Sequence, residues 1–458
     1  MWRKLLDMAR QAGTREGEPM KDALVSGSLT ELQSAVERGE TSAVAAVRAC
    51  LEKIAAENEE LHVFISVRED EALAEAAAVD SRKTRSRASA LAGIPVAVKD
   101  LIDVQGMRTT AASHVLDGAA PAEADAECIR RLRAAGAIVV GKTNLHEFAY
   151  GGSGVISAYG AARNPLDRSR VCGGSSSGSA AAVAAGMCFG ALGTDTAGSI
   201  RLPAACCGVV GFKPTWGAVP ASGVIPLAWS YDHVGPLARS VEDAAALFAV
   251  LVDEVPPSGK NWAETSGLRC GVARKYFCEG LAPEVEAGFE RVLEAVRRLG
   301  WSLHDVEIEV SEGRKVSNAE SWAFHEKWVA ERSALYDPRT LPRIVNGKKV
   351  GIEEYIEARR ELELARERQR EGIEGVDVVL TPTSPILPPT QEDLAGPESR
   401  TLELKMLRNT RPFNVLGWPT VTLPCGRMVG VQVSAGWGKN WLALAAAREI
   451  ERALLSVG

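Results

Sequence analysis

Between Leu91 and Leu237, short β-like runs alternate with alanine-rich helical runs, and glycines mark the turns between them. The pieces GIPVAV, AECIRRLRAAG and AIVVG follow one another in this way. The second piece predicts a helix over 124–135 that ends at Gly136, and the third predicts a strand over 137–140. Strand–helix–strand alternation is typical of an α/β domain, in which helices cover both faces of a sheet.

The flanking segments predict further helices and strands but no linker between independent domains. Helical spacing over 283–299 and 441–455 predicts two helices, and 302–310 and the runs DVVLTPTSP and GVQVSA predict strands. We therefore expect a single domain over 1–458. It would comprise a mobile lead-in at 1–20, a helical segment at 22–60, a core at 90–240, a more variable pocket region at 255–400 and a closing segment at 405–458.

The segment 351–374 predicts a long charged helix with a thin apolar stripe at Ile352, Ile356 and Leu362. A helix that is solvated on all but one side is the simplest interpretation of this pattern. A cover over the substrate pocket and a contact between protomers are the alternatives.

Charge and composition argue against several classes of function. A net charge of −6 gives no basic footprint for a nucleic acid. The first twenty residues lack an apolar signal core, and no stretch reaches the roughly 18 apolar residues of a membrane span. The nine cysteines show no C-x-x-C spacing, so we expect reduced, mostly buried thiols in a cytoplasmic protein.

Neither a metal nor another cofactor is expected. The six histidines are scattered without the spacing of metal ligands. The glycine-rich loops lack the G-K-[ST] ending of a phosphate-binding loop.

Three segments carry residues that packing alone does not explain, and small residues form a loop or turn in the first two. The run 173–179 opens an alanine-rich helix, so several N–H groups could point at one place, although a flexible loop would look the same. The run 193–204 places Ser199 after a turn of small residues, where consecutive amides can converge beside its hydroxyl. An acyl-transfer nucleophile needs this arrangement, because donors must meet the oxyanion.

The third segment, 93–100, ends an apolar strand with a lysine. Ile94, Val96 and Val98 share one face of the strand, which places Lys99 on the other face. Burial disfavours the ammonium form, so a buried lysine here would be a competent base. A salt bridge at the end of the strand is the alternative.

Together and in this order, the three segments resemble the amidase-signature family, and in particular its free-standing bacterial amidases. The matching pieces are the Gly-Gly-Ser-Ser loop, the D-T-x-G-S-I-R turn and the upstream V-K-D lysine. Longer blocks also match in family order, among them AGAIVVGKTNLHEFAYG, CCGVVGFKPT, DHVGPLARS and FNVLGWPTVTLPCG. The resemblance implies one large α/β domain whose central mixed, twisted sheet is covered by helices on both faces.

The resemblance also implies a mechanism without a cofactor. Ser199 would be the nucleophile, Ser175 a bridging serine in a cis peptide, and Lys99 the base. Four consecutive backbone amides would form the oxyanion hole, namely those of Thr196, Ala197, Gly198 and Ser199. Four side chains would support the turn, namely Ser176, Thr194, Asp195 and Arg201.

The expected reaction is hydrolysis of the C–N bond of a small-molecule amide, anilide or carbamate, as in a urethanase, rather than of a peptide bond. The pocket is expected to take residues from the loop 150–154, including Tyr150, Gly151 and Gly152, and from 315–360. Four aromatic residues in the second segment could line the pocket or belong to the core: Trp322, Phe324, Trp328 and Tyr336. A homodimer is an open alternative for the assembly.

The chain departs from the family pattern at two places. Ala197 stands where many members have glycine, and Cys172 stands where proline is frequent. Neither position carries a catalytic side chain, so the expected mechanism is unaffected.

Two alternative functions compete with the free-standing amidase. Residues 174–178 match the G-x-S-x-G elbow of α/β-hydrolases with Ser176 as nucleophile, but a polar loop precedes them instead of the required strand. The glutaminase component of the glutamyl-tRNA amidotransferase complex, its A subunit, belongs to the same family. Against it, Leu202 replaces that component's usual glutamine, S-Y-D-H-V-G-P replaces S-L-D-Q-I-G-P, and no arginine-bearing block that would grip glutamine is evident.

Overall fold

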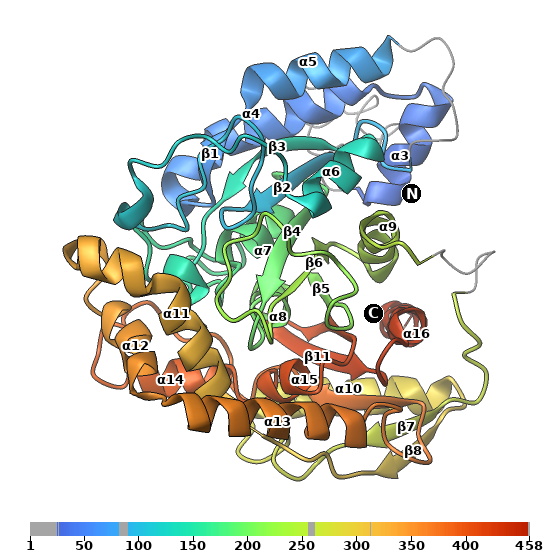
Figure 1. Ribbon diagram of the computed structural model, residues 1–458. Helices are drawn as coiled ribbons and strands as arrows, with labels where there is room; N and C mark the ends of the chain where they lie inside the picture. Colours follow the sequence, from blue (N-terminus) through green and yellow to red (C-terminus); the bar gives the residue numbers. More distant parts are fainter. Residues whose placement is uncertain (1–24, 26, 82–89, 255–261, 312, 457–458) are drawn as a thin grey trace.

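Eleven strands form a single sheet in the part of the chain that the computed structural model describes, which is residues 25, 27–81, 90–254, 262–311 and 313–456. The strands are β1 (Phe64–Val67), β2 (Pro95–Lys99), β3 (Ile138–Thr143), β4 (Gly190–Asp195), β5 (Val210–Lys213), β6 (His233–Ala238), β7 (Arg269–Val272), β8 (Ser302–Asp305), β9 (Val378–Pro382), β10 (Thr420–Gly426) and β11 (Val429–Ser434). Their order in the sheet is β1-β3-β2-β4-β6-β5-β10-β11-β9-β7-β8 (Figure 1). The predicted lead-in at 1–20 lies outside the described residues.

The sheet is mixed, as the family resemblance implied. Strand β2 runs parallel to β3 and β4, β7 runs parallel to β8 and β9, and the other neighbours are antiparallel. Val98 of β2 pairs with Leu192 of β4. The carboxyl ends of these parallel strands therefore meet at the same edge of the sheet, which brings Lys99 next to the end of β4.

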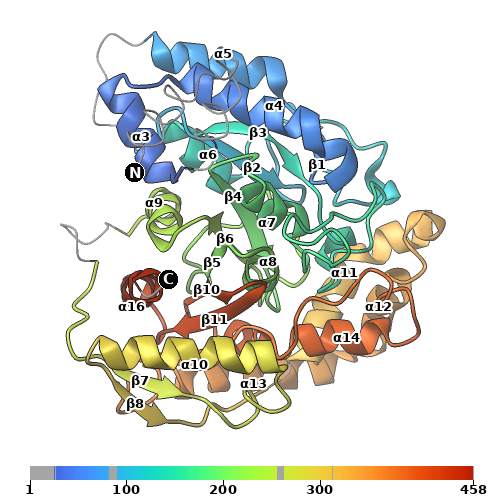
Figure 2. The ribbon, with the colours of Figure 1, turned by 180° about the vertical axis from the view of Figure 1, so that it is seen from behind.

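Helices cover both faces of the sheet and enclose two separate apolar cores (Figures 1 and 2). The core on one face is built with α3 (Leu29–Arg38), α6 (Glu127–Ala134), α9 (Val241–Leu251), α10 (Pro283–Arg298) and α16 (Asn440–Leu455). The core on the other face is built with α5 (Glu69–Asp80), α7 (Ser177–Ala184) and α8 (Arg201–Cys207), and α4 (Ala43–Leu61) contributes to both. None of the described helices is both long and apolar enough to cross a membrane.

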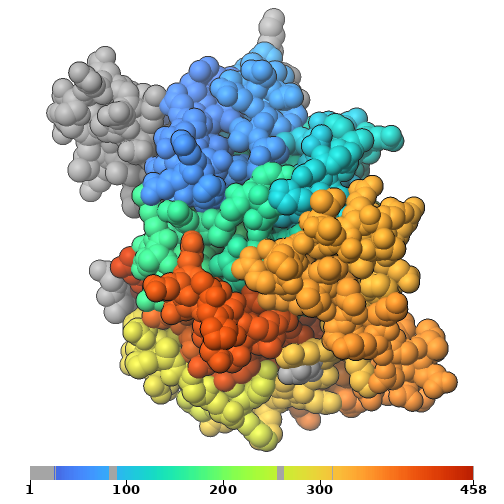
Figure 3. All heavy atoms as spheres, turned by 90° about the vertical axis from the view of Figure 1, so that its left-hand side faces the viewer, coloured from blue at the N-terminus to red at the C-terminus, as the bar shows by residue number. Residues whose placement is uncertain are grey.

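A third group of helices lies at one side of the sheet, where it forms much of the face seen in Figure 3. It comprises α11 (Arg314–Arg332), α12 (Leu341–Val345), α13 (Ile352–Arg368), α14 (Ser399–Met406) and α15 (Arg411–Val415). Short 3-10 helices in the described part are η1 (His114–Leu116), η2 (Glu147–Ala149), η3 (Ser333–Leu335) and η4 (Asn346–Lys349).

Local sequence signals account for several of these boundaries. Ser28 and Ser42 accept hydrogen bonds from the first turns of α3 and α4, as N-cap residues do. Gly136 adopts a positive φ of 90° after α6, as expected of a glycine that ends a helix. All nine cysteines have free thiols, and only Cys278 is partly exposed.

Two predicted elements end several residues earlier in the structure than expected. The strand predicted over 302–310 ends at Asp305, and the helix predicted over 351–374 ends at Arg368. Of the predicted apolar stripe, Ile352 and Ile356 are 71% and 59% exposed, whereas Leu362 is 4% exposed. Helix α13 packs against α11 and α15, so the prediction is right for Leu362 and wrong for the two isoleucines. Its residues do not line the pocket described below, so α13 does not form a wall of that pocket.

Candidate active site

Lys99 lies at the end of β2 with its side chain fully buried. Its Nζ donates to Ser175 Oγ and to Thr194 Oγ1, both at 2.7 Å. Burial lowers the pKa of Lys99 from 10.5 to about 7, although the negative charges of Asp195 and Asp232 oppose this shift. Two hydroxyls thus hold the Lys99 amine, in place of the carboxylate that the salt-bridge alternative required. The lowered pKa makes the neutral amine accessible near neutral pH.

The loop before α7 carries Ser175 next to this amine. The Gly174–Ser175 peptide is cis, as the resemblance implied. Gly174 N donates to Gly152 O at 2.7 Å, and a Cβ at Gly174 would lie 2.7 Å from Gly154 N, so the close approach of these two loops requires glycine.

Ser176 supports this loop and does not face the pocket. Its Oγ donates to Thr194 O at 3.2 Å, and its N–H donates to Ser199 O at 3.2 Å. The side chain is fully buried, and a loop, not a strand, leads into residue 174. The elbow alternative with Ser176 as nucleophile is therefore wrong, because its hydroxyl is inaccessible and the required strand is replaced by a loop.

The turn that carries Ser199 follows β4 and is shaped by Asp195. Asp195 Oδ1 accepts from Gly198 N at 2.7 Å, and Oδ2 accepts from Ile200 N at 3.1 Å. Gly198 has a φ of 130°, and a Cβ there would lie 2.1 Å from Thr410 Oγ1, so only glycine fits. The Gly198 amide was expected in the oxyanion hole, but Asp195 already engages it. The candidate donors that remain are the amides of Thr196, Ala197 and Ser199.

A buried ion pair fixes this turn to the rest of the sheet. Arg201 Nε lies 3.0 Å from Asp195 Oδ2, and both side chains are fully buried. Burial alone would raise the pKa of Asp195, but the Arg201 guanidinium holds it well below its ordinary value. Arg201 also donates to Gln432 Oε1 at 2.7 Å and to Asn414 Oδ1 at 2.6 Å, which ties the turn to β11 and α15.

In the Asp195→Ala variant, we expect the free energy of unfolding to fall by about 3–5 kcal/mol, because Arg201 would keep a buried charge without its partner. Urea unfolding of both proteins measures this difference. The matched control is Glu307→Ala, which breaks an ion pair with Lys275 whose side chains are 73% and 70% exposed. The control should remain close to wild type. A loss in Asp195→Ala no larger than that of the control would contradict the assigned role of the buried pair.

Asp232 positions Thr196, the first residue of the turn, a role that the sequence did not reveal. Thr196 Oγ1 donates to Asp232 Oδ1 at 2.6 Å, and the amides of Leu227 and Ala228 donate to its other oxygen. Burial raises the pKa of Asp232 to about 7 despite these hydrogen bonds. Through Thr196, this carboxyl group orients one of the candidate oxyanion donors.

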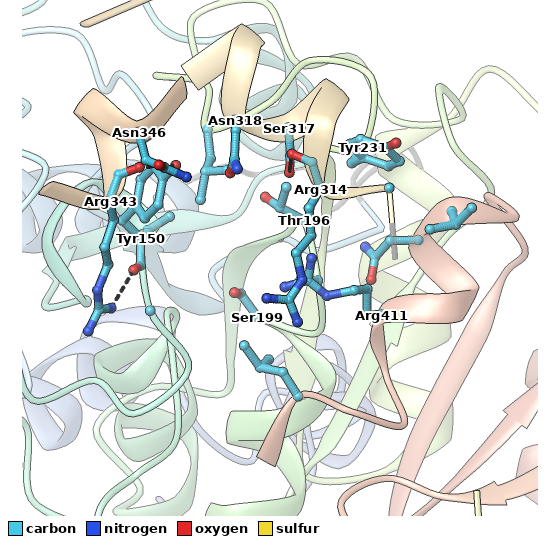
Figure 4. A pocket seen from close by; sticks show the side chains of 18 of the residues that line it. Tyr150, Thr196, Ser199, Tyr231, Arg314, Ser317, Asn318, Arg343, Asn346 and Arg411 are labelled. Carbon is cyan, nitrogen blue, oxygen red and sulfur yellow. Dashed lines mark hydrogen bonds between the residues drawn. The ribbon is translucent and has the colours of Figure 1, made fainter. Parts of the chain in front are cut away.

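Ser199, Thr196 and Ala197 line a pocket of about 580 Å³, which Figure 4 shows from close by. Tyr150 and Gly151 also line it, as expected. Gly152 does not, because its backbone lies against Gly174 and any Cβ would meet Leu407 at 2.8 Å.

Other lining residues come from two regions far apart in the sequence. The region expected at 315–360 contributes Ser317, Asn318, Pro342, Arg343, Asn346 and Lys349, preceded by Gly313 and Arg314. Residues between 400 and 415 were missed, and contribute Arg400, Leu407, Arg411, Asn414 and Val415. The fold gathers four arginines here. No arginine-bearing block is evident in the sequence because these residues come from four separate helices.

Of the four aromatic residues between 322 and 336, Tyr336 is buried in the apolar cluster around Phe148, and the three others are half-buried beside it. Trp328 and Tyr336 lie 5.8 Å and 5.4 Å from the Phe148 ring, and Phe324 packs on His325 and Trp328. Trp322 packs against the same apolar cluster. None of the four lines the pocket, so the interpretation that these aromatic residues contact the substrate there is wrong.

The described residues contain no group of three or more His, Cys, Asp and Glu side chains that could hold a metal ion. The structure thus places the Ser175 hydroxyl 2.7 Å from the buried amine of Lys99, and Ser199 at the wall of the pocket. These parts match the sequence blocks on which the family resemblance rested.

Comparison with known families agrees with this geometry. The model of the Amidase family matches residues 45–440. The chain belongs to the amidase family. This membership confirms the resemblance to amidase-signature proteins, and the mixed sheet is the fold of its solved relatives.

Similar members of the family carry two kinds of name. The chain is 34% identical to the A subunit of the glutamyl-tRNA(Gln) amidotransferase of Koribacter versatilis (strain Ellin345), over 92% of this chain and 97% of that protein. A solved amidase superposes with a TM-score of 0.84 at 34% identity, covering 93% and 99% of the two chains. The corresponding amidotransferase chain from Thermotoga maritima superposes with a TM-score of 0.73 at 30% identity, covering 94% and 95%.

Proposed function

We propose that this member of the amidase family is an amidohydrolase, which cleaves the C–N bond of a small amide, anilide or carbamate through an acyl-enzyme on Ser199. The observation that carries the proposal is the buried amine of Lys99, which lies 2.7 Å from Ser175 Oγ and has a pKa of about 7. The Ser199 turn is hydrogen-bonded to the Ser175 loop and opens into the pocket.

In the proposed first step, Ser199 Oγ attacks the carbonyl carbon while its proton passes to Ser175 Oγ. The proton of Ser175 passes to neutral Lys99 Nζ. The amides of Thr196, Ala197 and Ser199 donate to the oxyanion that develops. The relay then runs in reverse to protonate the leaving nitrogen, and the C–N bond breaks. Water attacks the acyl ester by the same relay, which releases the acid and restores Ser199.

This scheme predicts that kcat/KM rises with pH and levels off above an inflection near pH 7. Below the pKa of about 7, Lys99 is an ammonium and cannot accept the proton. A pH profile measures the inflection. Asp232 also has a pKa of about 7, so the profile is repeated with Asp232→Asn, in which an inflection should remain but move to lower pH, because the charge of Asp232 raises the pKa of Lys99. An inflection close to the ordinary lysine value of 10.5, or its loss in Asp232→Asn, would contradict the scheme.

A second candidate is the glutaminase component of an amidotransferase, which would release ammonia from glutamine for a partner chain. The names of the similar curated proteins support this alternative more strongly than they support a free-standing amidase. Two observations favour the amidase. The superposition is better on the solved amidase, and none of the described pocket residues is an Asp or Glu that could pair with the ammonium group of glutamine.

The test measures hydrolysis by the purified chain alone on p-nitroanilides, aryl carbamates and glutamine, with Ser199→Ala as the blank. We expect hydrolysis of at least one amide or carbamate in preference to glutamine. Hydrolysis of glutamine alone, or activity that requires added partner chains, would favour the amidotransferase.

A further inference from the structure

His233 lies on β6 directly opposite Asp195 of β4, at the start of the turn that carries Ser199. Its side chain is 4% exposed and takes no part in the proposed proton relay. Nδ1 of the ring lies 3.0 Å from Asp195 O and 2.6 Å from Tyr231 O. Both neighbours are carbonyl oxygens, which only accept, so Nδ1 carries the ring proton and donates to them.

The other ring nitrogen of His233 fixes this tautomer. Nε2 lies 3.1 Å from Nζ of Lys213, a fully buried side chain that also donates to the backbone oxygens of Pro214 and Trp418. Because the lysine nitrogen donates here, Nε2 accepts and carries no proton. Burial and the neighbouring Lys213 hold the pKa of His233 well below its ordinary value, so the ring stays neutral. The ring therefore presents an N–H to the Asp195 carbonyl.

The direction of the Asp195 carbonyl sets the direction of the Thr196 amide, because both belong to one planar peptide group. Gly174–Ser175 is the only cis peptide in the part of the chain that the structure describes, so the Asp195–Thr196 peptide is trans. In a trans peptide the oxygen and the N–H point in opposite directions. A donor on the oxygen also polarises the peptide group, which strengthens the N–H as a hydrogen-bond donor.

Two side chains from distant elements hold this oxygen. His233 reaches it from β6, and Asn414 Nδ2 reaches it from α15 at 3.0 Å. Strand β4 lies between β6 and β2. With the carbonyl facing His233 on β6, the Thr196 N–H faces the side of β2, the strand that ends in Lys99. Thr196 and Ser199 line the same pocket, so this is the side on which an oxyanion on the substrate would need a donor.

We propose that His233 is a positioning residue of the oxyanion hole, which aims the Thr196 amide by donating from Nδ1 to the Asp195 carbonyl. This role rests on the proposed acyl transfer to Ser199, in which the oxyanion forms. His233 is not among the described residues that line the Ser199 pocket, so it acts through the peptide group and not on the substrate. The expected signature is a loss in kcat with little change in KM, because the oxyanion develops only in the transition state.

Two substitutions separate this hydrogen bond from the bulk of the ring. In His233→Leu, which has a side chain of similar volume but no donor, kcat on the best substrate of the panel should fall by about 10- to 100-fold. This loss is smaller than that from deleting an oxyanion donor itself, because Asn414 still holds the carbonyl. His233→Asn carries an amide N–H at the place of Nδ1 and should recover most of the activity, although it leaves a larger cavity.

His325→Leu is the matched control. His325 is also fully buried, packs on Phe148 and lies 2.8 Å from Tyr336 Oη, away from the Ser199 turn. Its loss should leave kcat close to wild type. Thermal melting shows that each variant is folded, and kcat should follow the hydrogen bond at position 233 rather than the melting temperature. The inflection near pH 7 should remain in every variant, because Lys99 keeps its partners.

The rate of labelling by a fluorophosphonate probe makes the same comparison without an amide substrate, because the phosphonyl oxygen takes the place of the oxyanion. His233→Leu should label about tenfold more slowly than the wild type, whereas His233→Asn and His325→Leu should label at close to its rate.

Unchanged kcat and labelling in His233→Leu would overturn the proposal. A His233→Asn protein as impaired as His233→Leu, a loss that appears in KM alone, or an equal loss in His325→Leu would also overturn it. A wild-type protein that labels on Ser199 but hydrolyses no member of the panel contradicts the proposed amide hydrolysis alone, and the labelling rates then decide the role of His233. A wild-type protein that does not label contradicts both.

Discussion

In the Ser199→Ala protein, we expect amide hydrolysis to fall by about 10⁴-fold or more, because the hydroxyl that forms the acyl-enzyme is gone. The fold should remain, since Ser176 N donates to the backbone oxygen of Ser199 and Asp195 holds the turn through backbone amides. Steady-state kinetics on the best substrate of the panel measures the loss.

Ser176→Ala is the matched control for this substitution, because Ser176 is a neighbouring serine whose hydroxyl is fully buried against Thr194. We expect its activity to exceed that of Ser199→Ala by at least about two orders of magnitude, because removing a supporting residue costs less activity than removing the nucleophile. Comparable activity in folded Ser199→Ala and wild-type protein would end the acyl-enzyme scheme.

The second large effect is expected in Lys99→Met, with a fall in kcat of about 10³-fold, because general-base catalysis contributes on this order. Methionine matches the length and the buried surroundings of this side chain, but it cannot take a proton. The inflection near pH 7 should disappear together with the activity.

Lys142→Met provides the control for burial. Lys142 lies on the neighbouring strand β3, is also fully buried, and pairs with Asp100 at 2.8 Å. Its loss should lower stability and leave the inflection near pH 7 in place. If Lys99→Met and Lys142→Met change the pH profile alike, Lys99 is a structural residue and not the base.

Much of the fold could be predicted because its signals are local. The helix over 283–298 follows from the spacing of its apolar residues, and the end of α6 at Gly136 follows from the conformational freedom of a single glycine. The stripe at Ile352 and Ile356 misled the prediction because periodicity identifies a face but not its partner. In the tertiary structure, α11 and α15 meet a different face of α13.

The residues of the candidate site also fall into two groups, those that a local sequence pattern reveals and those that only the tertiary structure brings together. Ser199 and its supporting Asp195 and Arg201 lie within seven residues of one another, so one stretch of sequence reveals them. The hydrogen bond from the Gly198 amide to Asp195, which removes this amide from the expected oxyanion hole, could also have been predicted. An aspartate often accepts from the amide three residues later.

The gathering of arginines at the pocket could not be predicted from the sequence. Arg314 and Arg411 are separated by nearly one hundred residues, and no local pattern sets them apart from surface arginines. Only the packing of α11 and α15 beside the Ser199 turn brings them to one pocket. Asp232 was missed for a related reason, because its role depends on contact with Thr196 on another strand end.

The central claim, that Ser199 is the nucleophile, is tested most directly by intact-mass analysis after reaction with a fluorophosphonate probe. The wild-type and Ser176→Ala proteins should each gain the mass of one phosphonyl group, and Ser199→Ala should gain none. Labelling that persists in Ser199→Ala and is lost in Ser176→Ala would contradict the account, because the reactive hydroxyl would then lie on the other serine.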